Sequence, residues 1–406
     1  MSLSWEALYA QRVRWMKDSV TMDFQRLAAI PGMISFFAGL PDPGLYPIED
    51  LATAVQHVLT EDGRGALQYA PQEGYRPLKT YLVERLKRVG VPAREEDMLI
   101  VTGSIQGLDL VSEMLIDPGD TVVVENPTFS GAIEVFDKYG ASYIPIDVDE
   151  DGMVVDDLEP ILQGHPVKFI YTMPNFHNPM GVDLSVERRK KLLELSDRYG
   201  VPIVTDDPYG ELRYRGVPAP HLRALKGDAN VIMLSTFSKL LAPGMRLGWL
   251  LAPHAIVRPL RLGKLTADRS TNHLSQRIVC EMGKQGMLER HLERMISIQG
   301  QKLECMLAAM AECFPPEVRW TKPEGGYFVW VTLPPGMDAM TLLQDAEAER
   351  VAFVPGASFF AKGGGENTLR LCFVNTPLRD IPEGIRRLAR VLSTALSART
   401  EARGRE

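Results

Sequence analysis

A lysine and an arginine follow an apolar run in the segment STFSKLLAPGMRLGWL, which covers residues 235–250. A lysine amine that is removed from water holds its proton less tightly, so it can attack a carbonyl carbon. An arginine guanidinium can bind a phosphate through two parallel hydrogen bonds. Lys239 and Arg246 could therefore bond to a carbonyl compound and hold its phosphate, although any one of the chain's 45 lysines and arginines is by default a surface residue.

Polar and aromatic residues also follow other short apolar runs. Thr102, Gly103 and Ser104 come after residues 99–101 and precede a helical pattern, so backbone N–H groups at a helix start could bind an anion. The alternative is a capped helix start without a ligand. The remaining candidates, which could instead be core, turn or helix-start residues, are Phe129, Asn178, Asp206 and Tyr209.

The apolar runs predict the elements that position these residues. They cover residues 99–101, 121–124, 168–172, 202–205, 231–234 and 248–252, and helical patterns such as residues 104–116 lie between them. Short β-branched strands that alternate with helices indicate a mostly parallel sheet with helices on both faces. Because ligands of such sheets bind beyond the carboxyl ends of the strands, we expect the candidates to meet at one edge of the sheet.

Pyridoxal phosphate is a ligand that would use this whole set. Its phosphate needs N–H groups, hydroxyls and an arginine, and its ring needs a flat apolar cover. Its pyridine nitrogen needs a carboxylate that keeps it protonated, which makes the ring an electron sink. Its phenolic oxygen needs donors such as Asn178 and Tyr209, and its aldehyde needs a lysine of lowered pKa.

The order and spacing of the motifs resemble those of fold type I pyridoxal-phosphate enzymes, and among them the class I/II aminotransferases. The motifs are QYAPQEG, TGSIQG, NPTF, HNPMG, DDPYGEL, STFSK with its following arginine, PEGGYF and LRLCF. The chain is most similar to the branch of aminoadipate, kynurenine and MocR-type aminotransferase domains, from FFAGLPDPGLYP to LRLCFVN. The resemblance implies an α/β fold with a mostly parallel seven-stranded sheet in a large domain and a smaller α/β domain.

The resemblance also implies a role for each site residue. Lys239 is identified as the Schiff-base lysine, Asp206 as the partner of the pyridine nitrogen, and Arg370 as the clamp for the substrate carboxylate. Gly39 would line the substrate pocket. The other implied cofactor contacts are Gly103, Ser104, Gln106, Thr236, Ser238 and Arg246 at the phosphate, Phe129 on the ring, Asn178 and the catalytic Tyr209 at the phenolic oxygen, and Tyr69 from a neighbouring subunit. Tyr69 could instead be a plain core tyrosine.

Two departures from the family pattern bear on the substrate. Met22 stands where the aminoadipate branch has an arginine that binds an acidic side chain, and Leu40 stands where this branch has glycine. A buried carboxylate without a cation costs several kcal/mol, roughly, whereas an apolar side chain gains from an apolar surface. We therefore expect a neutral aliphatic or aromatic amino donor, unless Arg26, one helical turn further along, replaces the missing arginine.

Length and composition set the remaining expectations. A chain of 406 residues favours two domains, and we expect an N-terminal arm at 1–45 packing on the small domain, a large cofactor domain at 46–290 and a small domain at 291–406. The net charge of −7 is spread along the chain, which argues against nucleic acid as a partner. The four cysteines form no CxxC pair and no metal site is indicated, which fits a reducing cytoplasm. No signal peptide or long apolar stretch predicts a membrane partner.

These features predict a pyridoxal-phosphate-dependent aminotransferase. The resemblance implies that Lys239 moves a proton between the substrate α-carbon and the cofactor, and that a 2-oxo acid such as 2-oxoglutarate accepts the amino group by a ping-pong mechanism. It also implies a homodimer with shared active sites. One alternative is another reaction with the same cofactor, such as β-elimination, decarboxylation or racemisation. Another is a non-enzymatic MocR-type effector domain, which is disfavoured because about 30 residues before the arm motif are too few for a DNA-binding domain.

Overall fold

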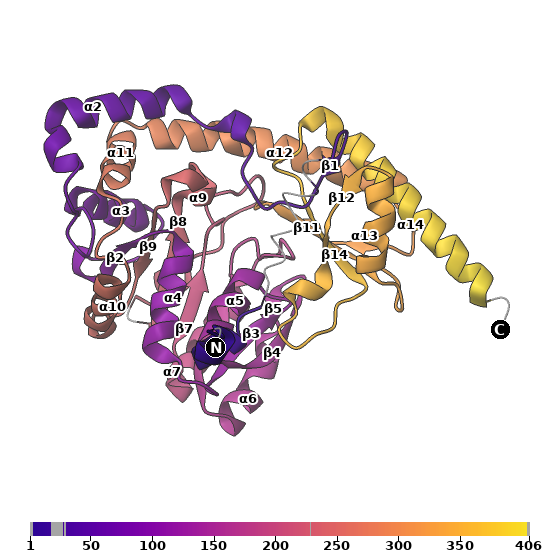
Figure 1. Cartoon of the computed structure of the whole chain (residues 1–406), viewed down its shortest axis with the longest axis horizontal. Coiled ribbons are helices and arrows are strands. Elements are labelled where there is room, and N and C mark those ends of the chain that lie inside the picture. Colours follow the sequence, from indigo (N-terminus) through magenta and orange to yellow (C-terminus); the bar gives the residue numbers. More distant parts are fainter. Residues whose placement is uncertain (1–2, 18–26, 28–29, 228, 404–406) are drawn as a thin grey trace.

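The computed structural model describes residues 3–17, 27, 30–227 and 229–403. Its largest element is an eight-stranded sheet with the strand order β2-β9-β8-β7-β6-β3-β4-β5 (Figure 1). The strands are β2 (Met98–Val101), β3 (Thr121–Asn126), β4 (Ser142–Asp149), β5 (Gly152–Met153), β6 (Val167–Thr172), β7 (Ile203–Asp206), β8 (Val231–Thr236) and β9 (Gly248–Leu251).

The sheet is mostly parallel, as the sequence predicts. Strands β4, β3, β6, β7 and β8 run parallel to one another, whereas β9 is antiparallel to β2 and β8, and β5 is antiparallel to β4. The expected number of seven strands is wrong by one. The additional strand is β5, a two-residue pairing at the edge of the sheet that is too short to produce a hydrophobic pattern.

Helices cover both faces of this sheet because successive strand side chains point to opposite faces. On one face, Val123, Ile170 and Ile203 pack against leucines of α6 (Leu158–Gly164), α7 (Val186–Tyr199) and α8 (Leu222–Leu225). On the other face, Val122 and Val124 belong to the cluster that includes α4 (Ser104–Leu115) and α5 (Ser130–Lys138). The result is a sheet between two helical layers, whose strand ends are free to build a site.

A second, four-stranded antiparallel sheet follows later in the chain, in the order β10-β11-β14-β13. Its strands are β10 (Arg319–Trp320), β11 (Phe328–Thr332), β13 (Val354–Pro355) and β14 (Thr368–Cys372). Helices α13 (Ala339–Ala348) and α14 (Ile381–Arg403) pack together beside it (Figure 1). The remaining helices are α2 (Ile48–Ala66), α3 (Arg76–Arg88), α9 (Phe237–Leu240), α10 (His254–Ala267), α11 (His273–Lys284) and α12 (Met287–Cys313).

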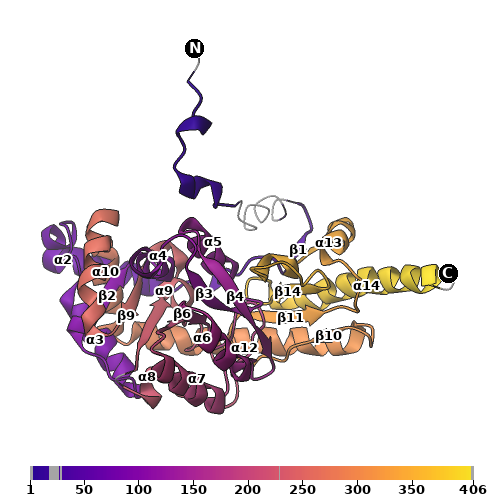
Figure 2. The ribbon, with the colours of Figure 1, turned by 90° about the horizontal axis from the view of Figure 1, so that it is seen from below.

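The N-terminal segment makes two kinds of contact. Strand β1 (Ile34–Ser35) pairs in parallel with β12 (Val351–Ala352), and the Phe36 backbone bonds to Ala352 and Cys372, so this part of the arm lies on the smaller sheet. Residues 3–17 run beside α5, and their N-terminal end points away from the rest of the chain (Figure 2). There Lys17 Nζ lies 3.1 Å from a carboxylate oxygen of Asp137. The domain boundaries at residues 45/46 and 290/291 stay predictions, and the second falls inside α12.

Among the described residues, no helix combines the length and the apolar character needed to cross a bilayer.

Candidate active site

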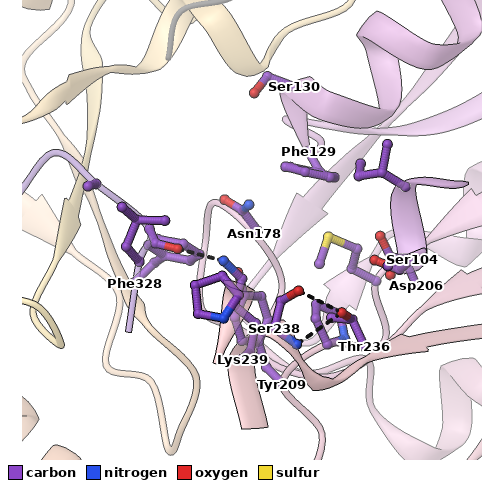
Figure 3. Close-up of a pocket in the computed structure, with 18 of the residues that line it drawn as sticks. Ser104, Phe129, Ser130, Asn178, Asp206, Tyr209, Thr236, Ser238, Lys239 and Phe328 are labelled. Atoms are coloured by element: carbon purple, nitrogen blue, oxygen red, sulfur yellow. Dashed lines mark hydrogen bonds between the residues drawn. The ribbon is translucent and has the colours of Figure 1, made fainter. Parts of the chain in front are cut away.

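A cavity of about 380 Å³ opens at the carboxyl ends of the large sheet, between it and the smaller sheet. Figure 3 shows how the labelled side chains converge on it from separate elements. The predicted site residues that line it are Gly39, Gly103, Ser104, Phe129, Asn178, Asp206, Tyr209, Thr236, Ser238, Lys239, Arg246 and Arg370. Gly103, Ser104, Phe129, Asn178, Asp206, Tyr209, Lys239 and Arg246, which end or follow strands of the large sheet, therefore meet at one sheet edge as expected, and Gly39 from the arm and Arg370 from the smaller sheet complete the wall.

The strand register explains why they meet. Asp206 is the last residue of β7 and Thr236 the last residue of β8. Gly248 on β9 pairs with both Thr236 and Val101, so it lies between the ends of β8 and β2. A side chain there would come within 2.7 Å of the Ser235 carbonyl oxygen and 2.9 Å of the Gly103 backbone. Glycine at this position lets the two strand ends approach closely.

Lys239 has the properties expected of a reactive amine. Its Nζ atom donates a hydrogen bond to the Gly39 carbonyl at 2.7 Å. Burial lowers its pKa to about 8, with Arg370 acting in the same direction and Cys372 and Asp206 opposing it. The Tyr327 hydroxyl donates to the Lys239 carbonyl at 3.0 Å, which holds the lysine backbone in place. About a tenth of this amine is therefore unprotonated at pH 7, far more than for a lysine in water.

Asp206 is a buried carboxylate with one unused oxygen. The side chain is 2% exposed, and burial and the neighbouring Asp207 raise its pKa to about 7. Tyr171 donates to its Oδ2 atom at 3.3 Å, whereas its Oδ1 atom has no hydrogen-bond partner in the described part of the chain. A buried acceptor without a partner is costly. A protonated ring nitrogen in the cavity would supply the missing donor.

The opposite end of the cavity is built for an anion. Helix α4 begins at Ser104, and its free backbone N–H groups carry the positive end of the helix dipole. Arg246 lies beside this helix start, because its Nη2 atom donates to the Thr102 carbonyl at 3.3 Å. Thr236 accepts a hydrogen bond from the Ser238 N–H at 3.1 Å, which presents two hydroxyls nearby. These groups match the needs of a phosphate.

Arg370 on β14 is positioned to bind a carboxylate. Its Nη1 atom donates to Asn178 Oδ1 at 2.9 Å and its Nη2 atom to the Phe37 carbonyl at 3.1 Å. The guanidinium lies 4.2 Å from the ring centre of Phe328 and 4.9 Å from that of Phe359. Burial lowers its pKa to about 10, which leaves it charged at neutral pH. Aromatic rings and carbonyls hold the charge, but the described residues offer it no carboxylate.

Gln106 is not part of the cavity, so its prediction as a phosphate contact is wrong. Its Oε1 atom accepts from the Thr102 N–H and from Lys264 Nζ, and its Nε2 atom donates to Asp268. The side chain is thus bonded to the buried Lys264 and to Asp268 beyond the end of α10, outside the cavity lining.

Tyr69 is 79% exposed, so the interpretation as a core tyrosine is wrong, and it lies outside the cavity of its own chain. Met22 and Arg26 lie outside the described residues.

Several apolar lining residues were not predicted. Ile105 belongs to the helical pattern of α4, but it is 40% exposed because it faces the cavity rather than the core. Phe328 is the last residue of the quoted motif PEGGYF, but no role was predicted for it. The other unpredicted lining residues include Phe37, Met173, Val354, Ser358 and Phe359.

The fold and the cavity together define a class of enzyme. A lysine with a pKa of about 8, an acceptor without a partner, an anion site and an aromatic cover at Phe129 surround one space. They fit the amine, ring nitrogen, phosphate and ring contacts of pyridoxal phosphate. The site is that of a pyridoxal-phosphate-dependent enzyme.

The chain belongs to the family of class I and II aminotransferases, whose family model matches residues 33–388. It is 41% identical to aromatic-amino-acid aminotransferase 1 of Thermococcus litoralis, over 96% of this chain and 95% of that protein. It is 40% identical to 2-aminoadipate transaminase of Thermus thermophilus, over 97% of this chain and 99% of that protein. The crystal structure of the α-aminoadipate aminotransferase LysN from Thermus thermophilus, complexed with N-(5′-phosphopyridoxyl)-L-leucine, matches with a TM-score of 0.91 and 39% identity, over 98% of this chain and 100% of that one.

The protein is therefore a fold type I transaminase that uses pyridoxal phosphate and acts on amino and 2-oxo acids. The expectations of cofactor, fold and reaction class are confirmed. The roles of individual residues stay predictions.

The role of Arg370 can be tested directly. We expect Arg370→Ala to lower kcat/KM for amino acids about 10- to 100-fold, because a hydrogen bond to a charged group contributes about 1.5–3 kcal/mol. Affinity for the cofactor should change little, since the predicted partner of Arg370 is the substrate carboxylate. The exposed Arg379→Ala is the control. An unchanged kcat/KM in Arg370→Ala would contradict the clamp.

Proposed function

We propose that this transaminase prefers neutral aliphatic or aromatic L-amino acids, such as leucine, methionine or phenylalanine, and transfers their amino group to a 2-oxo acid such as 2-oxoglutarate by a ping-pong mechanism. The supporting observation is the charge of the cavity wall. Among the described residues, the cations that line it are Lys239, Arg246 and Arg370. Each already has a proposed task, at the aldehyde, the phosphate and the substrate α-carboxylate.

The proposed division of labour follows from the geometry. Pyridoxal phosphate, when bound, supplies an aldehyde that reacts with amines and a ring that withdraws electrons. Arg246, the α4 helix start and the hydroxyls of Ser104 and Ser238 would hold the phosphate. Asp206 Oδ1 would accept the hydrogen bond from the ring nitrogen, and Asn178 and Tyr209 would contact the phenolic oxygen.

Lys239 would carry the proton. Its Nζ atom, with a pKa of about 8, can accept a proton from the substrate α-carbon and give it back near neutral pH. Arg370 would fix the α-carboxylate and thereby aim the α-hydrogen at this amine. Closure of the cavity by Phe328 and Phe359 would keep water from competing for the proton.

The side-chain end of the cavity favours an uncharged donor. Apolar side chains of the cavity wall include Phe37, Leu40, Ile105, Val354 and Phe359. The second carboxylate of an acidic donor would lose its water on entering the cavity, and the described wall offers no free cation to pair with it. Burying such an unpaired charge costs roughly several kcal/mol. The names of the relatives do not decide the matter, since one is an aromatic and one an aminoadipate enzyme. The leucine adduct in LysN agrees with an apolar donor in a related cavity.

Half-reaction rates test this preference. We expect leucine, methionine or phenylalanine to change the visible absorption of the holoprotein faster than glutamate or aminoadipate does. Leu40→Gly should slow the neutral donors roughly fivefold, because about 1 kcal/mol of apolar contact is lost, and should leave the acidic donors unaffected.

A faster reaction with glutamate or aminoadipate than with every neutral donor would contradict the proposal. Arg26→Ala would then show whether this arginine, outside the described residues, binds the second carboxylate.

We also propose a homodimer in which Tyr69 reaches the phosphate of the partner's site. Tyr69 and Leu67 are 79% and 72% exposed on one segment, which is unusual for two large apolar side chains. This segment and residues 270–274 border a second hollow that a second copy could fill. Light scattering should report a dimer. Tyr69→Phe should weaken cofactor binding but leave the dimer intact. A fully active monomer would rule out the shared site.

A further inference from the structure

Tyr171 lies behind Asp206 and outside the cavity wall. It is on β6, where it pairs with Val204 of β7. Side chains two residues apart on a strand share a face, so Asp206 lies diagonally across from Tyr171. Diagonal neighbours are within reach of an aromatic side chain. The register of two buried strands therefore places a phenol against the carboxylate.

The contact between them is fixed by packing. The Tyr171 hydroxyl donates to Asp206 Oδ2 at 3.3 Å, and both side chains are buried. The Tyr171 ring lies edge-on to Phe136 with 5.4 Å between the ring centres. Burial raises the pKa of Tyr171 far above its usual value, so the hydroxyl keeps its proton and can act as a donor. The hydroxyl therefore occupies one particular oxygen of the carboxylate.

The other charged groups near Asp206 change the energy of its charge but form no hydrogen bond with its Oδ2 atom. Asp207 repels a negative charge on Asp206, whereas Lys239 favours it. Asp207 itself is bonded to Asn175 and to the Gly210 N–H. On the other side of Tyr171, the carboxylate of Glu125 accepts from Thr172 and from the Met173 N–H. Asp206 Oδ1 is left without a partner among the described residues.

We propose that Tyr171 is a positioning residue for Asp206: its hydroxyl holds Oδ2, so that Oδ1 alone faces the cavity as the acceptor for the ring nitrogen of the cofactor. This inference rests on the proposed role of Asp206. The hydrogen bond also favours the ionised carboxylate, because a donor stabilises the charged form. Without the hydroxyl, Asp206 would take up a proton at a higher pH and could no longer keep the ring nitrogen protonated.

The test compares Tyr171→Phe with the natural protein in two measurements. In the apoprotein labelled with ¹³C at aspartate carboxyls, we expect the pKa of Asp206 to rise by about one unit. We expect the dissociation constant of pyridoxal phosphate to rise about tenfold near pH 6, where the variant carboxyl is protonated more often, and to be nearly unchanged near pH 9. Loss of the signal in Asp206→Asn identifies the resonance.

Tyr143→Phe is the matched control. Tyr143 is also a buried strand tyrosine, and its hydroxyl donates to Asp137 at 2.7 Å, away from the cavity. Its loss should change neither the Asp206 titration nor the pH dependence of cofactor binding. If Tyr171→Phe does not fold, Phe136→Leu loosens the same hydroxyl by removing the ring contact and should shift both quantities in the same direction.

The outcomes separate the two proposals. An unchanged Asp206 titration in Tyr171→Phe, or an equal loss of cofactor affinity at both pH values, would overturn the positioning role. If Asp206→Asn binds the cofactor as tightly as the natural protein, the role proposed for Asp206 itself fails.

Discussion

Lys239→Ala is expected to lower the rate of transamination by about 10⁴-fold, the upper end of what a positioned acid–base group contributes. The reason is that no second lysine lines the cavity among the described residues. A solvent amine or water would have to move the proton without the fixed position that the Tyr327 and Gly39 contacts give Lys239. The variant should still bind pyridoxal phosphate, because Arg246 and the α4 helix start remain.

Two measurements check this expectation. Single-turnover kinetics gives the rate of the proton transfer, and reduction with borohydride followed by mass spectrometry locates the covalent bond. The cofactor should be attached to Lys239 in the natural protein and to no lysine in the variant. Attachment to Lys264, the other buried lysine near this end of the sheet, would contradict the assignment.

Asp206→Asn is expected to lower the activity of the enzyme and to raise the stability of the apoprotein. We expect a loss of about 10²- to 10³-fold in activity, the usual cost of removing one preorganised electrostatic contact from an active site. In the apoprotein we expect the opposite effect on folding. At pH 8 the free energy of unfolding should rise by about 2–4 kcal/mol, because asparagine removes a buried negative charge that has no full set of partners.

The sign follows from the pKa of Asp206, which rises from 3.8 to about 7 on burial. The folded protein then binds this proton more tightly than the unfolded chain does, so the carboxyl lowers stability as the pH rises from about 4 to about 7. Urea unfolding of both apoproteins at pH 5 and pH 8 measures the difference. The gain from Asp206→Asn should be large at pH 8 and small at pH 5. An equal change at both pH values would mean that the charge is not its cause.

In the large sheet, the sequence predicted the strands that are apolar on both faces and did not predict β4 or the two-residue strand β5 at its edge. Strands β6, β7 and β8 are buried almost throughout, so their apolar runs are continuous. Strand β4 next to the edge has exposed Ser142 and Asp147, and its mixed pattern does not stand out. Over a few residues, the alternating polar and apolar pattern of a half-exposed strand cannot be told from the sequence of a loop.

The site was predictable where chain order alone determines position. Asp206 is the last residue of β7 and Lys239 lies on α9, which follows β8 directly, so the sheet brings them together. Gln106 was assigned to the phosphate because it follows the same strand end as Gly103 and Ser104. The direction of its side chain is instead set by its hydrogen bonds to Lys264 on α10 and to Asp268 just after that helix, which are distant in sequence. The lining contributed by Val354 and Phe359 depends on how the smaller sheet approaches, which no local pattern records.

The cavity is assembled from three parts of the chain, and this has a consequence for how the enzyme can change. Asp206 ends β7 of the large sheet and Lys239 lies on α9 just after β8, whereas Phe37 and Leu40 come from the arm, and Val354 on β13 and Phe359 in the turn after it come from the region of the smaller sheet. Substitutions in the arm can therefore alter which amino acid fits while the proton-transfer groups keep their places. Such a protein can change its range of amino acid substrates by single substitutions. A designer could change the substrate range in the same way by exchanging residues 37–40 as one segment.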